Sequence, residues 1–230
     1  MEWYEELDFD ENPFTTETKF VGNEDVLKEA VYAIVSGNMI VLEGSDGSGK
    51  SKILKEIIKK FGGYGRIAYL NAKTLDRELN IEEVLAKKNG VLGFLFKKYP
   101  KNMILLLDDV EHLSPKNMER IKYFFDTNNL RAVIITTKNF ENLKLTESVK
   151  QRIRTVIPLH ALSEFEAVQV VRDKVGEHVL TDRVLKETYK CSERNMQKFL
   201  SNCELVCKAW LANKNLSEED VKKLLGRGVQ

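Results

Sequence analysis

Hydrophobic and polar positions divide the chain into two stretches with different periodicity. Between residues 39 and 158, short apolar runs indicate strands buried on both faces, and segments with apolar residues at helical spacing separate them. Strands that alternate with helices in this way predict a parallel sheet with helices on both of its faces. The expected strands are 39–42, 66–70, 103–107, 132–135 and 156–157, and the expected helices are 23–36, 50–61, 81–98 and one that begins at Ser114-Pro115.

After Pro158 only helical spacing remains. Ser163 and Ser217 are expected to cap two of these helices, because a serine hydroxyl can accept a hydrogen bond from a free backbone N–H. The expected organisation is an irregular N-terminal arm over 1–20, an α/β core over 21–160 and a small all-helical lid domain over 161–230. Within the lid domain, helices are expected at 163–175, 181–190, 192–213 and 217–225.

The composition excludes several classes of protein. Of the 230 residues, 43% are hydrophobic and 31% are charged, which is the balance of a folded chain rather than a disordered one. The net charge of +1 does not indicate a strongly basic nucleic-acid protein. No apolar run is long enough for a membrane-spanning helix, and the acidic N-terminus lacks the pattern of a signal peptide. Three cysteines, an odd number, indicate reduced thiols and a cytoplasmic location.

One glycine-rich segment carries the main chemical signal. It lies between the strand expected at 39–42 and the helix expected at 50–61, and it fits the phosphate-binding pattern G-x-x-x-x-G-K-[ST]. Glycines let successive backbone N–H groups turn inward around an anion, and the helix that follows adds its positive end. In this pattern the lysine reaches the β- and γ-phosphates and the last hydroxyl is a ligand of Mg²⁺. The segment consists of Gly44, Ser45, Asp46, Gly47, Ser48, Gly49, Lys50 and Ser51.

Two acids follow the strand expected at 103–107 and complete a nucleotide site. A carboxylate at the end of a buried strand is the usual second ligand of Mg²⁺ in such sites, so Asp108 is the expected metal ligand. Asp109 is expected to orient or deprotonate the attacking water. The segment Thr137-Lys138-Asn139-Phe140 lacks the aspartate of the motif by which GTPases read guanine, which favours ATP with Mg²⁺.

With these motifs in place, the sequence resembles the AAA+ ATPases over nearly its whole length. The resemblance implies a P-loop NTPase core, a helical lid and assembly into homo-oligomers that hydrolyse ATP. It also implies several further roles: Val21 and Gly22 contact adenine, Thr137 is the sensor 1 residue that detects the γ-phosphate, Arg152 is an arginine finger for the neighbouring subunit, and Arg194, within Ser192–Asn195 at the start of the third lid helix, is the sensor 2 residue.

Within the AAA+ ATPases, the sequence resembles the group of ExeA-like secretion ATPases, transposition regulators and origin-recognition initiators. The likeness rests on Glu11-Asn12-Pro13-Phe14, Gln151-Arg152-Ile153 and Leu162-Ser163-Glu164. It implies a nucleotide-dependent switch or motor that acts on DNA or on a protein complex bound to DNA.

The sequence departs from this family pattern at two points. The family usually has Asp-Glu where this chain has Asp108-Asp109, and a shorter side chain misplaces the carboxylate, so slow hydrolysis is expected with Glu111 as an alternative base. Initiators usually continue into a winged-helix domain, but this sequence stops at Gln230, so sequence-specific DNA binding is not expected. The second hypothesis is therefore an adaptor that binds ATP with almost no hydrolysis and recruits a protein partner.

Several residues have two interpretations. Arg154 is an alternative finger, and either arginine can also be a surface residue or a partner of Glu147; Arg194 can pair with an acid of the lid. Trp3, Tyr4 and Phe14 either dock a partner or fix the arm to its own domain. A local cluster of lysines either contacts a DNA backbone or stabilises a helix C-terminus, and the second interpretation is preferred. The cluster consists of Lys87, Lys88, Lys97, Lys98 and Lys101. Cys203 and Cys207 lie one helical turn apart on an apolar stripe, which favours core packing over a metal site.

Overall fold

The computed structural model describes residues 2–62, 66–74, 80–88 and 99–226. By their contacts the residues form two units. The α/β unit comprises Asn23–Ser45 and Lys50–Leu159, and the helical unit comprises Met1–Gly22, Asp46–Gly49 and His160–Gln230. The second part of the helix expected at 81–98, with its lysines Lys97 and Lys98, lies outside the described residues.

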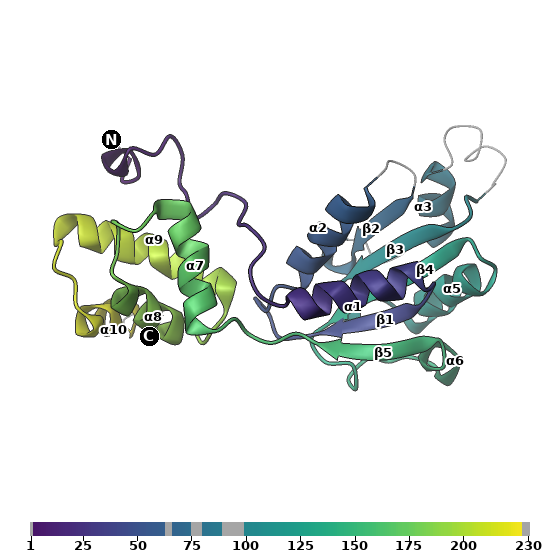
Figure 1. Ribbon diagram of the computed structural model, residues 1–230. Helices are drawn as coiled ribbons and strands as arrows, with labels where there is room; N and C mark the ends of the chain where they lie inside the picture. Colours follow the sequence, from purple (N-terminus) through teal and green to yellow (C-terminus); the bar gives the residue numbers. More distant parts are fainter. Residues whose placement is uncertain (1, 63–65, 75–79, 89–98, 227–230) are drawn as a thin grey trace. The chain divides into compact units, whose positions relative to one another are not determined.

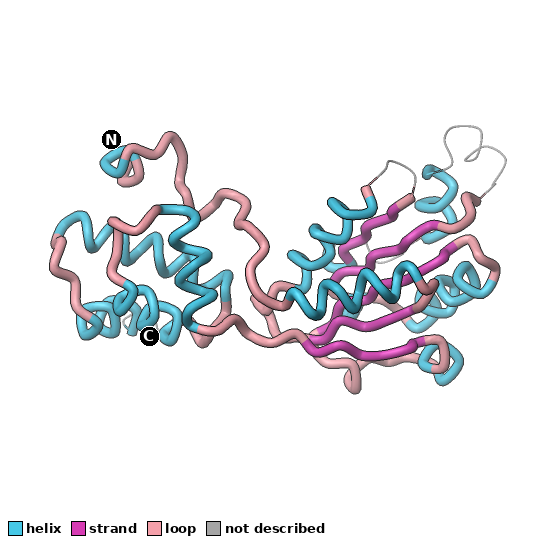
Figure 2. Tube along the Cα trace, in the orientation of Figure 1, coloured by secondary structure: helices cyan, strands magenta, loops and turns pink. Residues whose placement is uncertain are grey.

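A parallel sheet forms the centre of the α/β unit (Figures 1 and 2). The five strands are ordered β2-β3-β4-β1-β5, and every neighbouring pair is parallel. All five strands that the hydrophobic pattern predicts are present, so the predicted fold class is confirmed. Their bounds are β1 Met39–Glu43, β2 Ile67–Asn71, β3 Met103–Asp108, β4 Leu130–Thr137 and β5 Ile153–Pro158.

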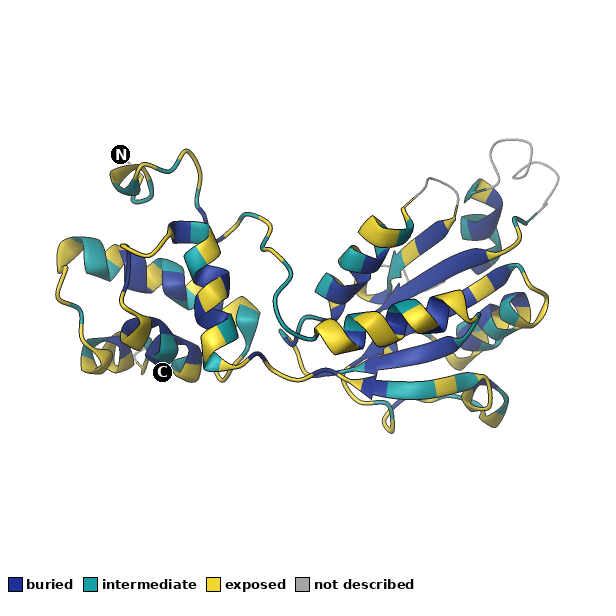
Figure 3. Cartoon of the chain, in the orientation of Figure 1, coloured by how far each residue is buried: buried dark blue, intermediate teal, exposed yellow. Residues whose placement is uncertain are grey.

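Helices cover both faces of this sheet and explain why its central strands are apolar without alternation. α1 (Glu24–Val35) and α2 (Lys50–Phe61) lie on one face, while α3 (Ile81–Lys88) and α5 (Pro115–Asp126) lie on the other (Figure 1). Every residue of β3 is buried as a result (Figure 3). Short helices η2 (Ala72–Thr74), η3 (Val110–His112) and α6 (Glu147–Lys150) complete the unit.

Side-chain caps set the start of two helices in the α/β unit. The Ser114 hydroxyl accepts a hydrogen bond from Asn117 N and Pro115 occupies the first turn of α5, as the sequence predicts. Thr146 caps α6 in the same way, accepting from Val149 N. The hydrophobic pattern does not predict α6, because a helix of four residues is too short to show a periodicity.

In its described residues, the helical unit has four α-helices around a separate hydrophobic core. They are α7 (Glu164–Val175), α8 (Asp182–Cys191), α9 (Met196–Ala212) and α10 (Glu218–Gly226), and Ser163 forms a reciprocal capping box with Glu166 at the start of α7. Cys203 and Cys207 are completely buried in this core, and burial raises the pKa of the Cys207 thiol to about 12. The cysteine pair is therefore core packing, and the described residues contain no cluster of metal-binding side chains around it.

One helix boundary differs from the sequence prediction. The third helix was expected from residue 192, but α9 begins at Met196, so Arg194 precedes the helix instead of opening it. Glu193 and Arg194 both have φ values in the left-handed region, at 55° and 57°. The Asn195 side chain sets the boundary, because its oxygen accepts hydrogen bonds from Gln197 N and Lys198 N.

The N-terminal arm packs onto its own helical unit, with a short helix η1 (Glu5–Leu7) near its start. Phe14 is only 7% exposed within the core of the unit, and the Trp3 ring stacks on it with a centroid distance of 6.0 Å. The Lys174 ammonium donates hydrogen bonds to the carbonyl oxygens of Pro13 and Thr16, both at 2.8 Å. Of the two interpretations of the arm aromatics, the structure favours attachment to their own domain.

None of the helices in the described part of the chain combines the length and the hydrophobicity that crossing a membrane requires.

Candidate active site

The glycine-rich loop joins the end of β1 to the start of α2. Gly47 and Gly49 have φ values of +75° and +100°, a region that other residues rarely adopt, which explains glycine at both positions. The Lys50 side chain folds back over the loop: its ammonium donates hydrogen bonds to the carbonyl oxygens of Gly44 at 2.6 Å and Ser45 at 2.9 Å. Lys50 is only 5% exposed, so its charge is concentrated inside the loop.

The environment of the Ser48 hydroxyl indicates whether a phosphate group fits this loop. Its hydroxyl is buried, and among the described residues it has no hydrogen-bond partner. Leaving a buried hydroxyl without a partner costs about 1–3 kcal/mol, and a phosphate oxygen held by the loop would supply the missing acceptor. The Lys50 ammonium and the N-terminus of α2 add positive charge at the same place, so the loop suits an anion. Ser51, the expected Mg²⁺ ligand, is exposed in the first turn of α2.

Asp108 ends β3 and is completely buried. One carboxylate oxygen accepts a hydrogen bond from the Thr136 hydroxyl at 2.6 Å, and the other accepts from the Tyr69 hydroxyl at 3.0 Å. These partners come from the neighbouring strands β4 and β2, whose carboxyl ends meet β3 at one edge of the sheet. Loss of hydration and then the Asp108 charge raise the pKa of Tyr69 to about 12, so its hydroxyl remains a donor at neutral pH.

Asp109 follows in an unusual backbone conformation. Its φ and ψ are both 56°, in the left-handed region, which costs a non-glycine residue about 1–2 kcal/mol. The Asp109 N–H donates a hydrogen bond to the Thr136 hydroxyl at 3.0 Å, and its carboxylate forms an ion pair with the Lys73 ammonium at 3.0 Å. Thr136 therefore links the two acids, since the same hydroxyl accepts from Asp109 N–H and donates to Asp108.

Thr137 and Glu111 form a second contact beside the acid pair. The buried Thr137 hydroxyl donates a hydrogen bond to Glu111 Oε1 at 2.9 Å, and Lys138 N–H donates to the same oxygen. Glu111 itself is exposed in η3. Of the two acids proposed as the base, Asp109 pairs with a cation, and Glu111 accepts hydrogen bonds from a hydroxyl and a backbone N–H.

Arg152 lies in the turn between α6 and β5, with its guanidinium paired to Asp126 of α5. The Nε–Oδ1 distance is 2.7 Å, and the hydrogen bond and charge of Asp126 raise the pKa of Arg152. Arg154 is exposed on β5. The interpretation that Arg152 pairs with Glu147 is wrong, because the Arg152 guanidinium pairs with Asp126, while Glu147 pairs with Lys150 at 3.0 Å.

Val21, Gly22 and Arg194 group by their contacts with the helical unit. Gly22 has a φ of +71° and lies so close to Leu162 that a Cβ atom would overlap this side chain. The carbonyl oxygen of Arg194 accepts a hydrogen bond from the buried Tyr189 hydroxyl at 3.1 Å. The described residues include no acid paired with the Arg194 guanidinium.

Sequence reasoning missed Tyr69 and Lys73 at the acid pair and Asp126 at Arg152. Tyr69 and Lys73 lie on either side of the end of β2, and β2 pairs with the strand that carries Asp108. The sequence does place both residues near the carboxyl end of a strand, and the carboxyl ends of adjacent parallel strands lie together. This signal leads to the acid pair only once β2 and β3 are known to be neighbours.

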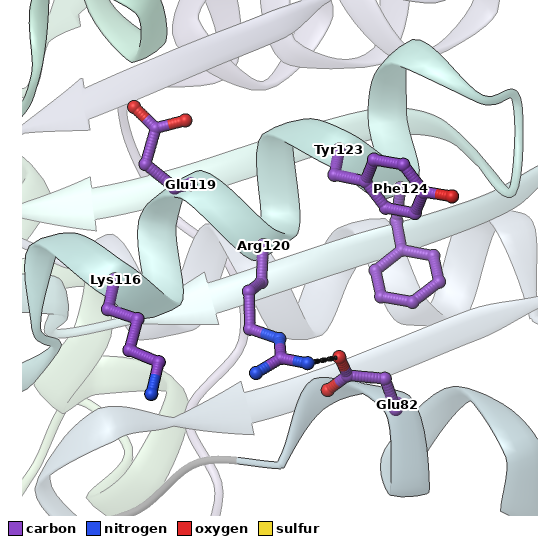
Figure 4. A pocket seen from close by; sticks show the side chains of 6 residues that line it. All are labelled: Glu82, Lys116, Glu119, Arg120, Tyr123 and Phe124. Atoms are coloured by element: carbon purple, nitrogen blue, oxygen red, sulfur yellow. Dashed lines mark ion pairs between the residues drawn. The ribbon is translucent and has the colours of Figure 1, made fainter.

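The structure also contains a cavity of about 380 Å³ between α3 and α5 (Figure 4). Arg120 pairs with Glu82 across it, while the Glu119 carboxylate points away from this pair. None of the expected nucleotide-binding residues lines it. The lining residues are Glu82, Lys116, Glu119, Arg120, Tyr123 and Phe124.

Comparison with known proteins places these features in a family. A family model described as AAA domain matches residues 36–168, which is more than half of the chain. An uncharacterized ABC transporter ATP-binding protein of Methanocaldococcus jannaschii is 23% identical over 177 residues, which cover 65% of this chain and 68% of that protein.

Solved structures share the fold at low sequence identity. Cdc6p of Pyrobaculum aerophilum is 16% identical with a TM-score of 0.71, covering 94% of this chain and 70% of that chain. The Holliday junction branch migration motor RuvB of Thermotoga maritima is 15% identical with a TM-score of 0.66, covering 94% of this chain and 73% of that chain. The ORC1 protein of Aeropyrum pernix, solved in complex with DNA, is 16% identical with a TM-score of 0.65, covering 94% and 68%.

These solved structures establish the likeness of the fold, and the family model extends from the end of α1 across the glycine-rich loop and the acid pair into α7. The resemblance to AAA+ ATPases is thereby confirmed, and the chain belongs to the AAA domain family.

Proposed function

We propose that this protein is a slow AAA+ ATPase that acts as a nucleotide-dependent switch or motor on DNA or on a DNA-associated protein complex. One observation carries the proposal: the buried Lys50 ammonium and the unpartnered Ser48 hydroxyl lie in a loop of the phosphate-binding pattern. A buried donor without a partner and a concentrated positive charge suit the phosphates of a nucleotide.

In this proposal the loop from Gly44 to Ser51 holds the phosphates of ATP, and Val21 and Gly22 contact the adenine. Ser51 and Asp108 would hold Mg²⁺, which neutralises phosphate charge when bound. Thr136 and Tyr69 support this role, because each donates a hydrogen bond to one Asp108 oxygen and orients the carboxylate.

Asp109 is the proposed base, with Glu111 as the alternative. Water adds to the γ-phosphorus, the bond from that phosphorus to the bridging oxygen of ADP breaks, and the proton of the water passes to the carboxylate. Thr137 would detect the γ-phosphate, and Arg194 would act as sensor 2. The ion pair between Lys73 and Asp109 supports slow turnover, since the cation competes for the oxygen that would accept the proton.

Arg152 would act on the nucleotide of a neighbouring subunit, which implies a homo-oligomer. An arginine supplied in trans is worth about 10³–10⁵ in kcat in comparable phosphoryl-transfer enzymes. The proposed link to DNA draws on two proteins of similar fold, the RuvB branch migration motor and the ORC1 protein in complex with DNA.

The alternative function is an adaptor that binds ATP with almost no hydrolysis and recruits a protein partner. The ion pair between Lys73 and Asp109 is the specific observation that favours it. A carboxylate paired with a cation is less available to accept the proton of water, whereas ATP binding does not require this step.

Steady-state ATP hydrolysis measured against protein concentration, with and without duplex DNA, separates the two functions. Lys50→Ala provides the blank, and binding of a fluorescent ATP analogue is measured in parallel. Activity per subunit that rises with concentration, and further with DNA, supports the switch or motor. Binding with a rate at the level of the blank supports the adaptor, and absence of both binding and hydrolysis contradicts both functions.

A further inference from the structure

Helix α5 holds the segment that carries Arg152 at two points. The first is Glu119. Its Oε1 atom accepts hydrogen bonds from the hydroxyl of Thr146, which caps α6, and from the hydroxyl of Ser148, which lies within α6. The hydrogen bonds from Ser148 and then Thr146 lower the pKa of Glu119, so the carboxylate stays ionised and keeps accepting both.

The second point is Asp126, which lies two helical turns further along the same face of α5. Its carboxylate binds one edge of the Arg152 guanidinium, with an Nε–Oδ1 distance of 2.7 Å and an Nη2–Oδ2 distance of 3.4 Å. A guanidinium has five N–H donors in a fixed plane, so this contact leaves both donors on Nη1 and one on Nη2. The Arg152 side chain is 43% exposed, which makes this remaining edge accessible.

Helix α5 is itself fixed on its other side. Arg120 pairs with Glu82 of α3, and Figure 4 shows the Glu119 carboxylate pointing away from this pair. The buried side chains of Met118, Ile121 and Phe124 anchor the helix to the sheet core. Because the helix has packing on the sheet and contacts on both sides, it is a rigid support for the Arg152 segment.

We propose that Glu119 and Asp126 are positioning residues that hold Arg152 with its Nη1 edge outward, ready to bind phosphate oxygens of the ATP held by a second copy of this chain. This inference rests on the proposed function, because it requires Arg152 to act in trans. It assigns a role to two acids that lie outside the nucleotide site of their own subunit.

Mixing two inactive variants tests this arrangement. The acceptor, Arg152→Ala, keeps its own nucleotide site but lacks the finger. The donor, Lys50→Ala, has an inactive site but keeps the finger, and an excess of donor over acceptor should restore hydrolysis. We expect Asp126→Asn in the donor to lower the restored kcat by about tenfold or more, because small misplacements of a catalytic group are costly. Glu119→Gln in the donor should have the same direction of effect.

The same substitutions placed in the acceptor should leave the restored rate unchanged within about twofold, a difference that a general folding defect would not produce. With Asp126→Asn in the donor, the KM for ATP should stay constant, since the acceptor site is intact. Asp126→Glu in the donor should recover part of the rate. Glu147→Gln in the donor is the matched control, because Glu147 lies on α6 but pairs with Lys150. Sedimentation of each mixture checks that the subunits still assemble.

Two results would overturn the inference in distinguishable ways. Failure of the first mixture to regain activity contradicts the trans role of Arg152 and the inference together. Restored activity that survives, or increases with, Asp126→Asn in the donor contradicts the inference alone.

Discussion

The ammonium of Lys73 lies 3.0 Å from a carboxylate oxygen of Asp109, the acid proposed as the base. The two residues come from different strand ends: Lys73 from η2 after β2, and Asp109 directly after β3. Lys73 keeps 46% of its side chain exposed, so the pair can open without unfolding the sheet.

Lys73→Met should therefore increase the turnover number. Removing the cation frees the Asp109 oxygen. An ion pair whose cation is half exposed is worth about 0.2–1 kcal/mol, so we expect kcat to rise by roughly 1.4- to fivefold. The measurement is steady-state hydrolysis at saturating ATP. Lys87→Met is the control, because Lys87 pairs with Glu83 on α3 and touches neither acid. A lower kcat in Lys73→Met would mean that the cation assists hydrolysis.

Tyr69→Phe should weaken the dependence of folding stability on alkaline pH. The pKa of Tyr69 is about 12 in the folded chain and near 10 when unfolded, so its stabilising contribution is complete below pH 10 and is lost as the pH rises towards 12. The free energy of unfolding should thus fall less over this range in Tyr69→Phe than in the wild type. Tyr32→Phe, which alters an exposed tyrosine on α1, should behave as the wild type does. Identical curves for all three proteins would contradict the prediction.

Thr136→Val should destabilise the α/β unit although the two side chains have the same shape. The valine removes one partner from the Asp109 N–H and one from the Asp108 carboxylate, both buried, at a cost of roughly 2–4 kcal/mol. Urea unfolding measures the loss. Thr155→Val on β5 is the matched control, expected within about 0.5 kcal/mol of the wild type. A loss in Thr136→Val no larger than in the control would show that water replaces the hydroxyl.

Phe14→Ala should destabilise the helical unit, because the arm contributes this ring to its core. Large-to-small substitution of a buried phenylalanine costs about 3–5 kcal/mol. Both tryptophans, Trp3 and Trp210, pack against this core, so their fluorescence during urea unfolding reports on it. Phe165→Ala, at a position 68% exposed on α7, should change little. Equal stabilities of the two variants would mean that the arm adds nothing to the unit.

Much of the fold was predictable because its signals are local. The apolar run of β3 and the glycines before Lys50 need only neighbouring residues to be interpreted, and so does the Ser114 cap. The helix boundary at Met196 was not predictable from periodicity. Arg194 lies next to the apolar stripe of α9, and the side chain of Asn195, not the pattern, decides where the helix begins.

The candidate site could be proposed from the sequence where a motif fixes the chemistry, but not where strand order brings residues together. Lys50 and Asp108 follow from motifs with a known spacing to a strand. Lys73 and Tyr69 approach the acids only because β2 lies beside β3, and Asp126 meets Arg152 across 26 residues of sequence. Such contacts depend on the tertiary arrangement, for which a single sequence provides little information.

The position of β2 at the end of the strand order has a further consequence. Within the described part of the chain, β2 has one hydrogen-bonded neighbour, so its backbone amides should open at a lower free energy than those of β1 and β3, which are paired on both sides. Tyr69 on β2 and Lys73 in η2 directly after it therefore belong to a region that can open locally, while β1 and β3, which lead into the loop and the acids, remain closed. In the proposed ATPase, mutations at the margin of the sheet would adjust the rate at little risk to the centre.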